Sequence, residues 1–263
     1  MPARTEKMLV AIPIYNEARN LHATLPGILQ HALPQADVLL LNDGSTDATA
    51  CILRKYERKS AVHLLTHEQN LGYGQSLIDA FHFAEQRGYT WVITMDCDQQ
   101  HDPRSLGQFF DLCRAEAADI ISGTRYSTYN FRDDAPPPDR AAINRLLTSV
   151  INASCGLQLT DSFCGYKAHR VASVQSLGLT EPGYAFPMQF WPRVACAGLS
   201  VIELPVRRIY VDPTRSFGQT LDDPDKRLRH YLEILTAELS DCAKPAPLHE
   251  LVLRSFDARV SCG

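Results

Sequence analysis

Residues 91–103 read WVITMDCDQQHDP, and this stretch decides the fold class of the chain. Its first part, Trp91–Met95, is a short run of mostly apolar residues, which is typical of a buried strand. A loop with two carboxylates one residue apart, Asp96 and Asp98, follows the strand at once. A buried strand that ends in a polar loop favours an α/β sheet with ligand-binding groups at its carboxyl edge.

The same order of apolar run and polar loop recurs through the first 125 residues. Strands are predicted at Met8–Ile14, Val38–Leu41, Val62–Leu65, Trp91–Met95 and Asp119–Ser122. Segments with helical spacing lie between them, at about 17–31, 46–59, 74–87 and 104–117. This alternation predicts a mainly parallel sheet with helices on both faces. Right-handed crossovers bring the carboxyl ends of such strands to one edge, so we expect the polar loops to meet there.

The pattern changes after residue 125. A charged, proline-rich loop (132–138) precedes a predicted helix at Asp139–Cys155, and 223–240 has the spacing of a charged amphipathic helix. Leu199–Val206 and Arg207–Val211 are predicted as a strand or hairpin. We expect one α/β domain over residues 1–221, followed by a C-terminal helical extension and tail over 222–263.

Composition excludes several classes of protein. The chain has 263 residues, 45% of them hydrophobic, a net charge of −4 and a pI of about 6.1, which does not suit a nucleic-acid binder. No stretch approaches the roughly 18 apolar residues of a membrane span, and the first residues lack a signal-peptide pattern. We therefore expect a cytoplasmic protein, with peripheral attachment at the inner membrane surface left open.

The pair Asp96 and Asp98 suggests a site for a divalent cation. Mg²⁺ and Mn²⁺ prefer oxygen ligands and complete their shells with water and substrate phosphates. Such a cation stabilises a departing diphosphate. The alternative is structural: Asp98 caps the next helix, while Asp96 binds amides of its loop.

The two earlier loops allow similar pairs of interpretations. Asp43 precedes turn and capping residues (Gly44–Asp47), and its carboxylate is suited to accept hydrogen bonds from a base or ribose. Asn16 is a possible helix N-cap, and Glu17 suits the positive end of a helix. Gly72 and Gly74 are expected to shape a helix start rather than to hold a phosphate.

Taken in order, these motifs carry a family resemblance. They are Pro13-Ile-Tyr15-Asn16-Glu17, Asn42–Asp47, Asn70-Leu-Gly72-Tyr-Gly74 and Asp96-x-Asp98-x-Gln100-His101-x-Pro103. In this order they resemble the family 2 glycosyltransferases, most of all the dolichyl- or polyprenyl-phosphate hexosyltransferase branch. The resemblance covers about residues 7–220 and implies a GT-A fold, an α/β fold with a mixed, mostly parallel sheet.

Later segments are also similar to that branch. They are Ser122–Tyr126, Asn144-Arg145, Asp161–Lys167, Glu203-Leu-Pro205-Val206 and Arg215-Ser-Phe-Gly218. The resemblance implies an inverting transfer of a hexose from a UDP- or GDP-sugar, with Mg²⁺ or Mn²⁺. The implied acceptor is a lipid phosphate at the membrane surface.

The resemblance also implies a role for each matching residue. Pro13, Tyr15, Glu17 and Asp43 would hold the nucleoside. Asp96, Asp98 and Gln100 would surround the metal and the donor diphosphate. Arg125 and Arg145 would receive the acceptor phosphate, and Arg215 would close over the donor phosphates. A phosphate acceptor needs no general base, whereas a hydroxyl acceptor does, and Asp161 is the carboxylate nominated for that case.

Two departures from the branch weaken the lipid-phosphate acceptor. Leu221 stands where its phosphate-closing loop usually has lysine, and Gln189 stands where many relatives have glutamate. Two other functions stay open. One is nucleotidyl transfer, although residues 13–20 contain no glycine and only one basic residue, Arg19. The other is a catalytically silent nucleotide-sugar-binding module.

Overall fold

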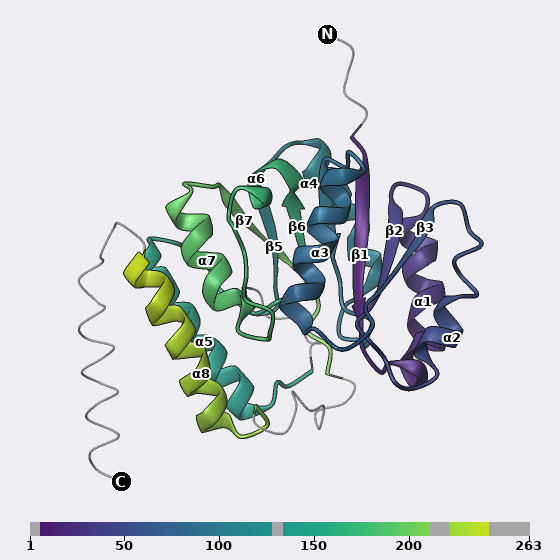
Figure 1. Ribbon diagram of the computed structural model, residues 1–263. Coiled ribbons are helices and arrows are strands. Elements are labelled where there is room, and N and C mark those ends of the chain that lie inside the picture. The colour runs from purple at the N-terminus through teal and green to yellow at the C-terminus, as the bar shows by residue number, and fades with distance from the viewer. Residues whose placement is uncertain (1–5, 128–133, 211–220, 242–263) are drawn as a thin grey trace.

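The computed structural model describes residues 6–127, 134–210 and 221–241. Its centre is a seven-stranded sheet in the order β3-β2-β1-β4-β6-β5-β7 (Figure 1). The strands are β1 (Met8–Ile14), β2 (Asp37–Asn42), β3 (Val62–Thr66), β4 (Trp91–Thr94), β5 (Ile120–Thr124), β6 (Lys167–Arg170) and β7 (Val201–Pro205). All neighbours pair in parallel except β6, which runs antiparallel to β4 and β5. The prediction of a mixed, mostly parallel sheet is confirmed.

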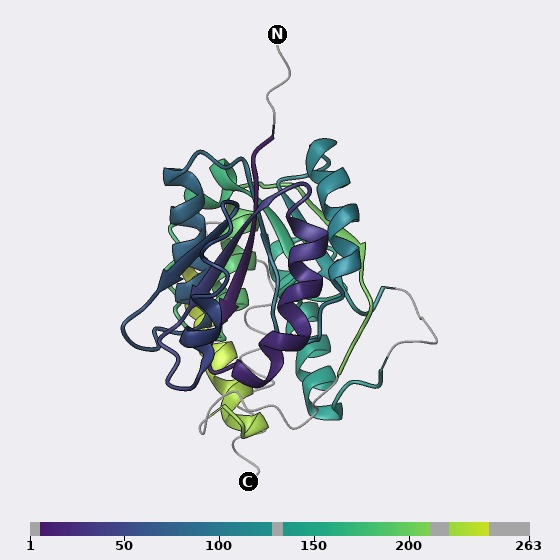
Figure 2. The ribbon, with the colours of Figure 1, turned by 90° about the vertical axis from the view of Figure 1, so that its right-hand side faces the viewer.

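Helices cover both faces of this sheet (Figure 2). They are α1 (Ala18–Ala32), α2 (Thr49–Leu53), α3 (Tyr73–Gln86), α4 (Leu106–Arg114, after the 3-10 turn η1, Pro103–Ser105), α5 (Pro138–Cys155), α6 (Val171–Gln175), α7 (Phe186–Cys196) and α8 (Pro224–Asp241). Alternate residues of β1 point to opposite faces. Val10 and Ile12 pack with α1 and α4, whereas Leu9 and Ala11 pack with α3 and α7.

Three elements were not predicted, β6, α7 and the five-residue helix α6, and the sequences of the first two explain why. Strand β6 reads KAHR, which lacks an apolar run, yet Lys167, Ala168 and His169 are buried because the strand lies between β4 and β5. Helix α7 contains Pro192 in its interior, a residue that ordinarily argues against a helix.

Other boundaries differ from the prediction. Helix α2 is only five residues long, where a helix over 46–59 was expected. Residues 206–210 do not continue the strand β7, so the predicted second strand at Arg207–Val211 is wrong over its described part, 207–210. In the part of the chain that the structure describes, no helix has the length and hydropathy needed to cross a bilayer.

Helix α8 belongs to the same core as the sheet. It lies beside α5 and α7 (Figure 1), and Tyr231 and Leu235 are buried in the core cluster that also contains α3. The carboxylate of Glu238 in α8 accepts hydrogen bonds from Arg193 and Gln189 of α7. The described part of the predicted extension therefore forms one wall of the domain.

We predict that Gly74→Ala destabilises the protein. A Cβ at Gly74 would overlap the carbonyl oxygen of Glu181, in the segment that packs against the start of α3. Forcing an extra carbon into such a contact costs about 1–3 kcal/mol, more than alanine gains in a helix. Urea unfolding of both proteins measures the difference.

Gly107→Ala is the matched control, because Gly107 is also helical and a Cβ there meets no atom within 4 Å. It should leave stability unchanged or raise it by about 0.5 kcal/mol. Equal effects of the two substitutions would contradict the close packing at Gly74.

Candidate functional site

A cavity of about 710 Å³ opens at the carboxyl ends of the parallel strands. Eight of the residues predicted for the site line it, and they are Pro13, Tyr15, Glu17, Asp43, Asp96, Asp98, Gln100 and Arg125. Asp161 and Arg145 are not among the lining residues. Arg215 lies outside the described residues. The expectation that the polar loops meet at one edge is confirmed.

The first two loops are joined by hydrogen bonds. Asn16 has a left-handed backbone (φ 53°), and its side-chain oxygen accepts from the amides of Thr46 (2.8 Å) and Asp47 (3.3 Å). Asp47 in turn accepts from the amide of Ala18 at the start of α1. Asn16 is therefore not the N-cap of α1; it holds the second loop, and the cap position is Glu17.

Asp43 is 3% exposed, and its carboxylate holds the backbone just before α3. Its carboxylate accepts from the amides of Leu71 (2.8 Å) and Gly72 (2.9 Å) and contacts Nδ1 of His67 at 2.7 Å. A structural role thus accounts for Asp43 as well, although it also borders the cavity. Gly72 is the N-cap of α3, as expected.

The acidic loop after β4 is stabilised by hydrogen bonds between its own residues. His101 is buried, stacks on Tyr166 and accepts a hydrogen bond from the amide of Asp96 through Nδ1 (2.9 Å). Burial lowers the pKa of His101 to about 4, so the ring is neutral at neutral pH. Asp98 accepts from the amide of Gln100 (3.0 Å).

The alternative role for Asp98 was to cap the next helix. The N-cap of η1 is Asp102, whose side chain accepts from the amide of Arg104. Asp98 is therefore not the helix cap, and its carboxylate lies in the cavity wall together with Asp96.

The residues of this loop suit a hard divalent cation. Asp96, Asp98 and Gln100 all line the cavity and offer only oxygen ligands from carboxylates and an amide, as Mg²⁺ and Mn²⁺ require. Within the described ranges, no group of three His, Cys, Asp or Glu side chains is placed to hold a metal ion. A cation here would thus take its remaining ligands from Gln100, water and substrate oxygens.

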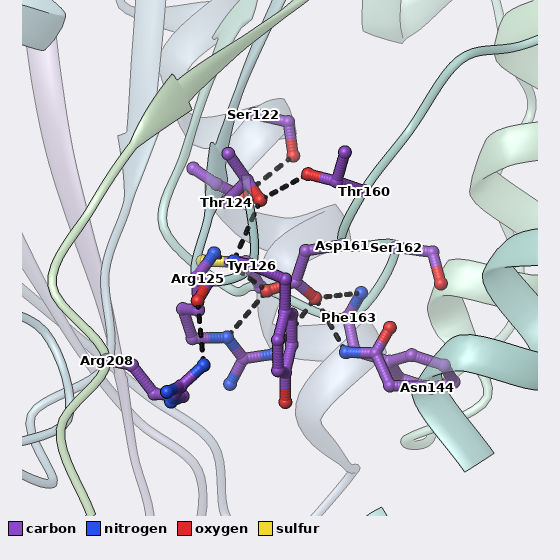
Figure 3. Close-up of polar contacts among 12 residues, drawn as sticks. Ser122, Thr124, Arg125, Tyr126, Asn144, Thr160, Asp161, Ser162, Phe163 and Arg208 are labelled. Carbon is purple, nitrogen blue, oxygen red and sulfur yellow. Dashed lines mark hydrogen bonds and ion pairs between the residues drawn. The ribbon is translucent and has the colours of Figure 1, made fainter. Parts of the chain in front are cut away.

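The side chains of Arg125 and Asp161 form a buried ion pair (Figure 3). Nε and Nη2 of Arg125 donate to the two carboxylate oxygens at 2.6 and 3.0 Å. Asn144 of α5 and the amide of Phe163 donate to the same carboxylate. Burial by itself raises the pKa of Asp161, but the charge and hydrogen bonds of Arg125 outweigh it and hold the pKa at about 2.

This environment does not support Asp161 as a general base. The residue is fully buried, its carboxylate is occupied by Arg125 and Asn144, and its low pKa makes it a poor proton acceptor. Arg125, by contrast, lines the cavity. Asp161 is therefore a group that positions the arginine.

Helix α5 presents a different arginine to the cavity from the one predicted. Arg145 is exposed, whereas Arg140 lines the cavity with Ile143 and Asn144. Arg140, Ile143 and Asn144 share one helix face, since residues three and four apart are neighbours. The helical spacing could have identified Arg140 from the sequence, because Arg145 lies off the helix face that Ile143 and Leu147 define.

Sequence analysis also missed two cavity residues of α8, Arg227 and Tyr231. The cavity wall therefore carries charged groups of both signs. Its carboxylates follow the strands β1, β2 and β4 (Glu17, Asp43, Asp96, Asp98). Its guanidinium groups follow β5 or belong to α5 and α8 (Arg125, Arg140, Arg227), and apolar side chains such as Ile143, Phe163 and Tyr231 complete the wall.

Comparison with known proteins is consistent with this geometry. The model of glycosyl transferase family 2 matches residues 9–178. Undecaprenyl-phosphate mannosyltransferase of Micrococcus luteus is 32% identical over 209 residues, which are 76% of this chain and 82% of that protein. Polyprenol monophosphomannose synthase of Mycolicibacterium smegmatis is 29% identical over 211 residues, 77% of each chain.

Solved structures share the fold at low sequence identity. Glucosyl-3-phosphoglycerate synthase from Mycobacterium tuberculosis, in complex with UDP, has a TM-score of 0.62 at 17% identity, covering 89% of this chain and 80% of that one. S. aureus TarS 1–349 with UDP-GlcNAc has a TM-score of 0.59 at 17% identity, covering 95% of this chain and 71% of that one. These likenesses confirm the predicted GT-A fold.

We predict that Asp161→Asn destabilises the protein by about 3–5 kcal/mol, because it leaves the Arg125 charge without its buried partner. The pH dependence should change as well. The folded-state pKa is about 2, below the ordinary 3.8. The carboxylate thus adds stability above pH 3.8 that is lost as the pH falls towards 2. Urea unfolding between pH 2 and 7 measures both effects.

Asp111→Asn serves as the control, because the side chain of Asp111 is 79% exposed and pairs with Arg114 on the surface of α4. Such a pair contributes about 0–1 kcal/mol. An Asp161→Asn protein as stable as the control, with the acid dependence of the wild type, would contradict the buried ion pair.

Proposed function

The chain belongs to glycosyl transferase family 2, and from this premise we propose that it transfers a hexose from a nucleoside-diphosphate sugar to a polyprenyl phosphate with the help of a divalent cation. The observation that carries the proposal is that one cavity is lined both by carboxylates and by guanidinium groups. Carboxylates suit a metal-bound diphosphate, and guanidinium groups suit a phosphate without a metal.

The donor is proposed to lie along the strand ends. Pro13, Tyr15, Glu17 and Asp43 border the nucleoside, and Asp96, Asp98 and Gln100 would hold Mg²⁺ or Mn²⁺ with the diphosphate. Bound there, the cation would stabilise the charge of the departing nucleoside diphosphate. The chain's own contribution is to orient the loop, through the bond from the Asp96 amide to His101.

The acceptor phosphate is proposed to bind Arg125. Its guanidinium is fixed by Asp161 and lines the cavity, so its orientation is set before the substrate arrives. Arg140 replaces Arg145 as the second arginine of this role, because Arg140 is among the lining residues of the cavity and Arg145 is not. The relatives named for polyprenol and undecaprenyl-phosphate acceptors support a lipid phosphate.

The mechanism proposed is direct displacement at the anomeric carbon with inversion. An oxygen of the acceptor phosphate attacks one face of the sugar, while the nucleoside diphosphate leaves from the other. The phosphate is already ionised at neutral pH, so no side chain has to remove a proton. A lipid acceptor would place the working enzyme at a membrane surface.

Gln189, which stands where many relatives have glutamate, lies in the packed interior and not at the cavity. Gln189 is 4% exposed and does not line the cavity. Its Oε1 accepts from the amides of Thr180 and Glu181, and its Nε2 donates to Glu238 of α8. Glutamine at this position therefore ties α7 to two neighbouring segments without removing a group from the cavity, which favours an active enzyme over a silent module.

We predict metal-dependent binding of one nucleoside diphosphate. UDP and GDP are each titrated calorimetrically with and without Mn²⁺. We expect one of the two to bind, and to bind only when Mn²⁺ is present. Asp98→Ala should weaken it at least about tenfold, because it removes a cation ligand. Asp102→Ala is the control, since Asp102 caps η1 in the same loop but does not line the cavity.

A second prediction concerns transfer itself. With the matching nucleotide-linked mannose or glucose, the wild type should glycosylate undecaprenyl phosphate in detergent, detected by mass spectrometry, and should not glycosylate undecaprenol. Nucleotide binding without transfer would indicate the silent module. Release of pyrophosphate from a nucleoside triphosphate and a sugar phosphate would indicate nucleotidyl transfer instead.

A further inference from the structure

Tyr73, the first residue of α3, brings its hydroxyl to the loop that contains Asp96. Both residues line the cavity. A Cβ added to Gly165 would lie 2.7 Å from the hydroxyl oxygen of Tyr73 and 2.8 Å from Oδ2 of Asp96, so the two oxygens border the same small space. Such distances are too short for a carbon atom. Glycine at position 165 therefore leaves room for the hydroxyl and the carboxylate to meet.

The hydroxyl of Tyr73 donates a hydrogen bond to the carboxylate of Asp96. Burial, the negative charge of Asp96 and this hydrogen bond together hold the pKa of Tyr73 well above its ordinary value. The phenol therefore keeps its proton at neutral pH, and an ionised carboxylate can only accept. A partner of this kind orients a metal ligand, and its removal typically weakens metal binding by about 10–100-fold.

The start of α3 holds the phenol in place. The two amides that precede Tyr73 donate to Asp43. The amide of Gln75 donates to the carbonyl of Pro182 at 3.0 Å. The ring of Tyr73 stacks on that of Tyr184, with centroids 5.9 Å apart and planes 13° from parallel. The backbone and the ring are thus fixed by the protein itself, so the position of the hydroxyl is set before any substrate arrives.

We infer that Tyr73 is a positioning residue of the cation site: its hydroxyl holds the carboxylate of Asp96 in the orientation that binds the divalent cation. This inference rests on the proposed function for the presence of the cation. His101 holds the backbone of Asp96 from within the loop, whereas Tyr73 holds its carboxylate from α3. The start of α3 therefore connects Asp43, on the proposed nucleoside side, with Asp96 on the cation side.

Binding of Mn²⁺ together with the nucleotide tests this role. UDP or GDP, whichever binds the wild type, is titrated calorimetrically with Mn²⁺ present, and electron paramagnetic resonance records the spectrum of the bound Mn²⁺. Tyr73→Phe keeps the ring and removes only the hydroxyl, so the affinity should fall at least about tenfold. The spectrum should change as well, because the orientation of a ligand has changed. A role in packing alone would leave that spectrum as it is in the wild type.

Tyr89→Phe is the matched control. The hydroxyl of Tyr89 also donates to a carboxylate, that of Asp37, at 2.6 Å, but neither residue lines the cavity. Its loss should leave the nucleotide affinity within about twofold of the wild type and the Mn²⁺ spectrum unchanged. Gly165→Ala is the second variant, because its Cβ separates the hydroxyl from the carboxylate. It should weaken binding by a smaller factor in a Tyr73→Phe background, where the hydroxyl is already gone, than in the wild type.

Two outcomes would overturn the inference while the proposed function stands. One is a Tyr73→Phe protein that binds Mn²⁺ and nucleotide like the wild type, and the other is one with weaker binding but the wild-type Mn²⁺ spectrum. If Tyr73→Phe melts well below the wild type, Gly165→Ala takes its place, and an unchanged affinity and spectrum there would overturn the inference too. A wild type that binds neither UDP nor GDP with Mn²⁺ and transfers no sugar would instead overturn the proposed function.

Discussion

The buried ion pair of Arg125 and Asp161 is the interaction on which the site depends. Asp161 follows α5 and precedes β6, whereas Arg125 directly follows β5, so the pair joins segments far apart in the chain. Glu203 of β7 holds the same turn by accepting from the amides of Thr160 and Asp161. Removing two charges from water is costly, and the bidentate geometry together with the bonds from Asn144 and the amide of Phe163 offsets that cost.

Hydrogen bonds between side chains and backbone amides also connect the loops that follow the strands. Asn16 binds the amides of the second loop, Asp43 binds the amides that precede α3, and His101 binds the amide of Asp96. Each polar side chain satisfies backbone amides of a neighbouring or its own loop. The loops are thereby fixed relative to one another, which is the condition for holding a cation and a substrate in a defined geometry.

Helices α5 and α8 complete the cavity from the opposite side. Helix α8 packs against α5 and α7, and Arg140, Arg227 and Tyr231 line the same cavity as the carboxylates. A single cavity thus presents both carboxylates and guanidinium groups.

The sequence by itself determined the parallel sheet, the helices on both faces, the edge where the loops meet and most of the strand-end residues. These follow from local periodicity and chain order, which any segment carries regardless of its neighbours. Only the tertiary structure decided that KAHR is a central strand, that Arg140 and not Arg145 faces the cavity, and that Asp161 positions Arg125. It also brought Arg227 to the site from a helix whose sequence indicates only a charged amphipathic surface. Burial and pairing of charges depend on which segments pack together in space, and that information is absent from any one stretch of the chain.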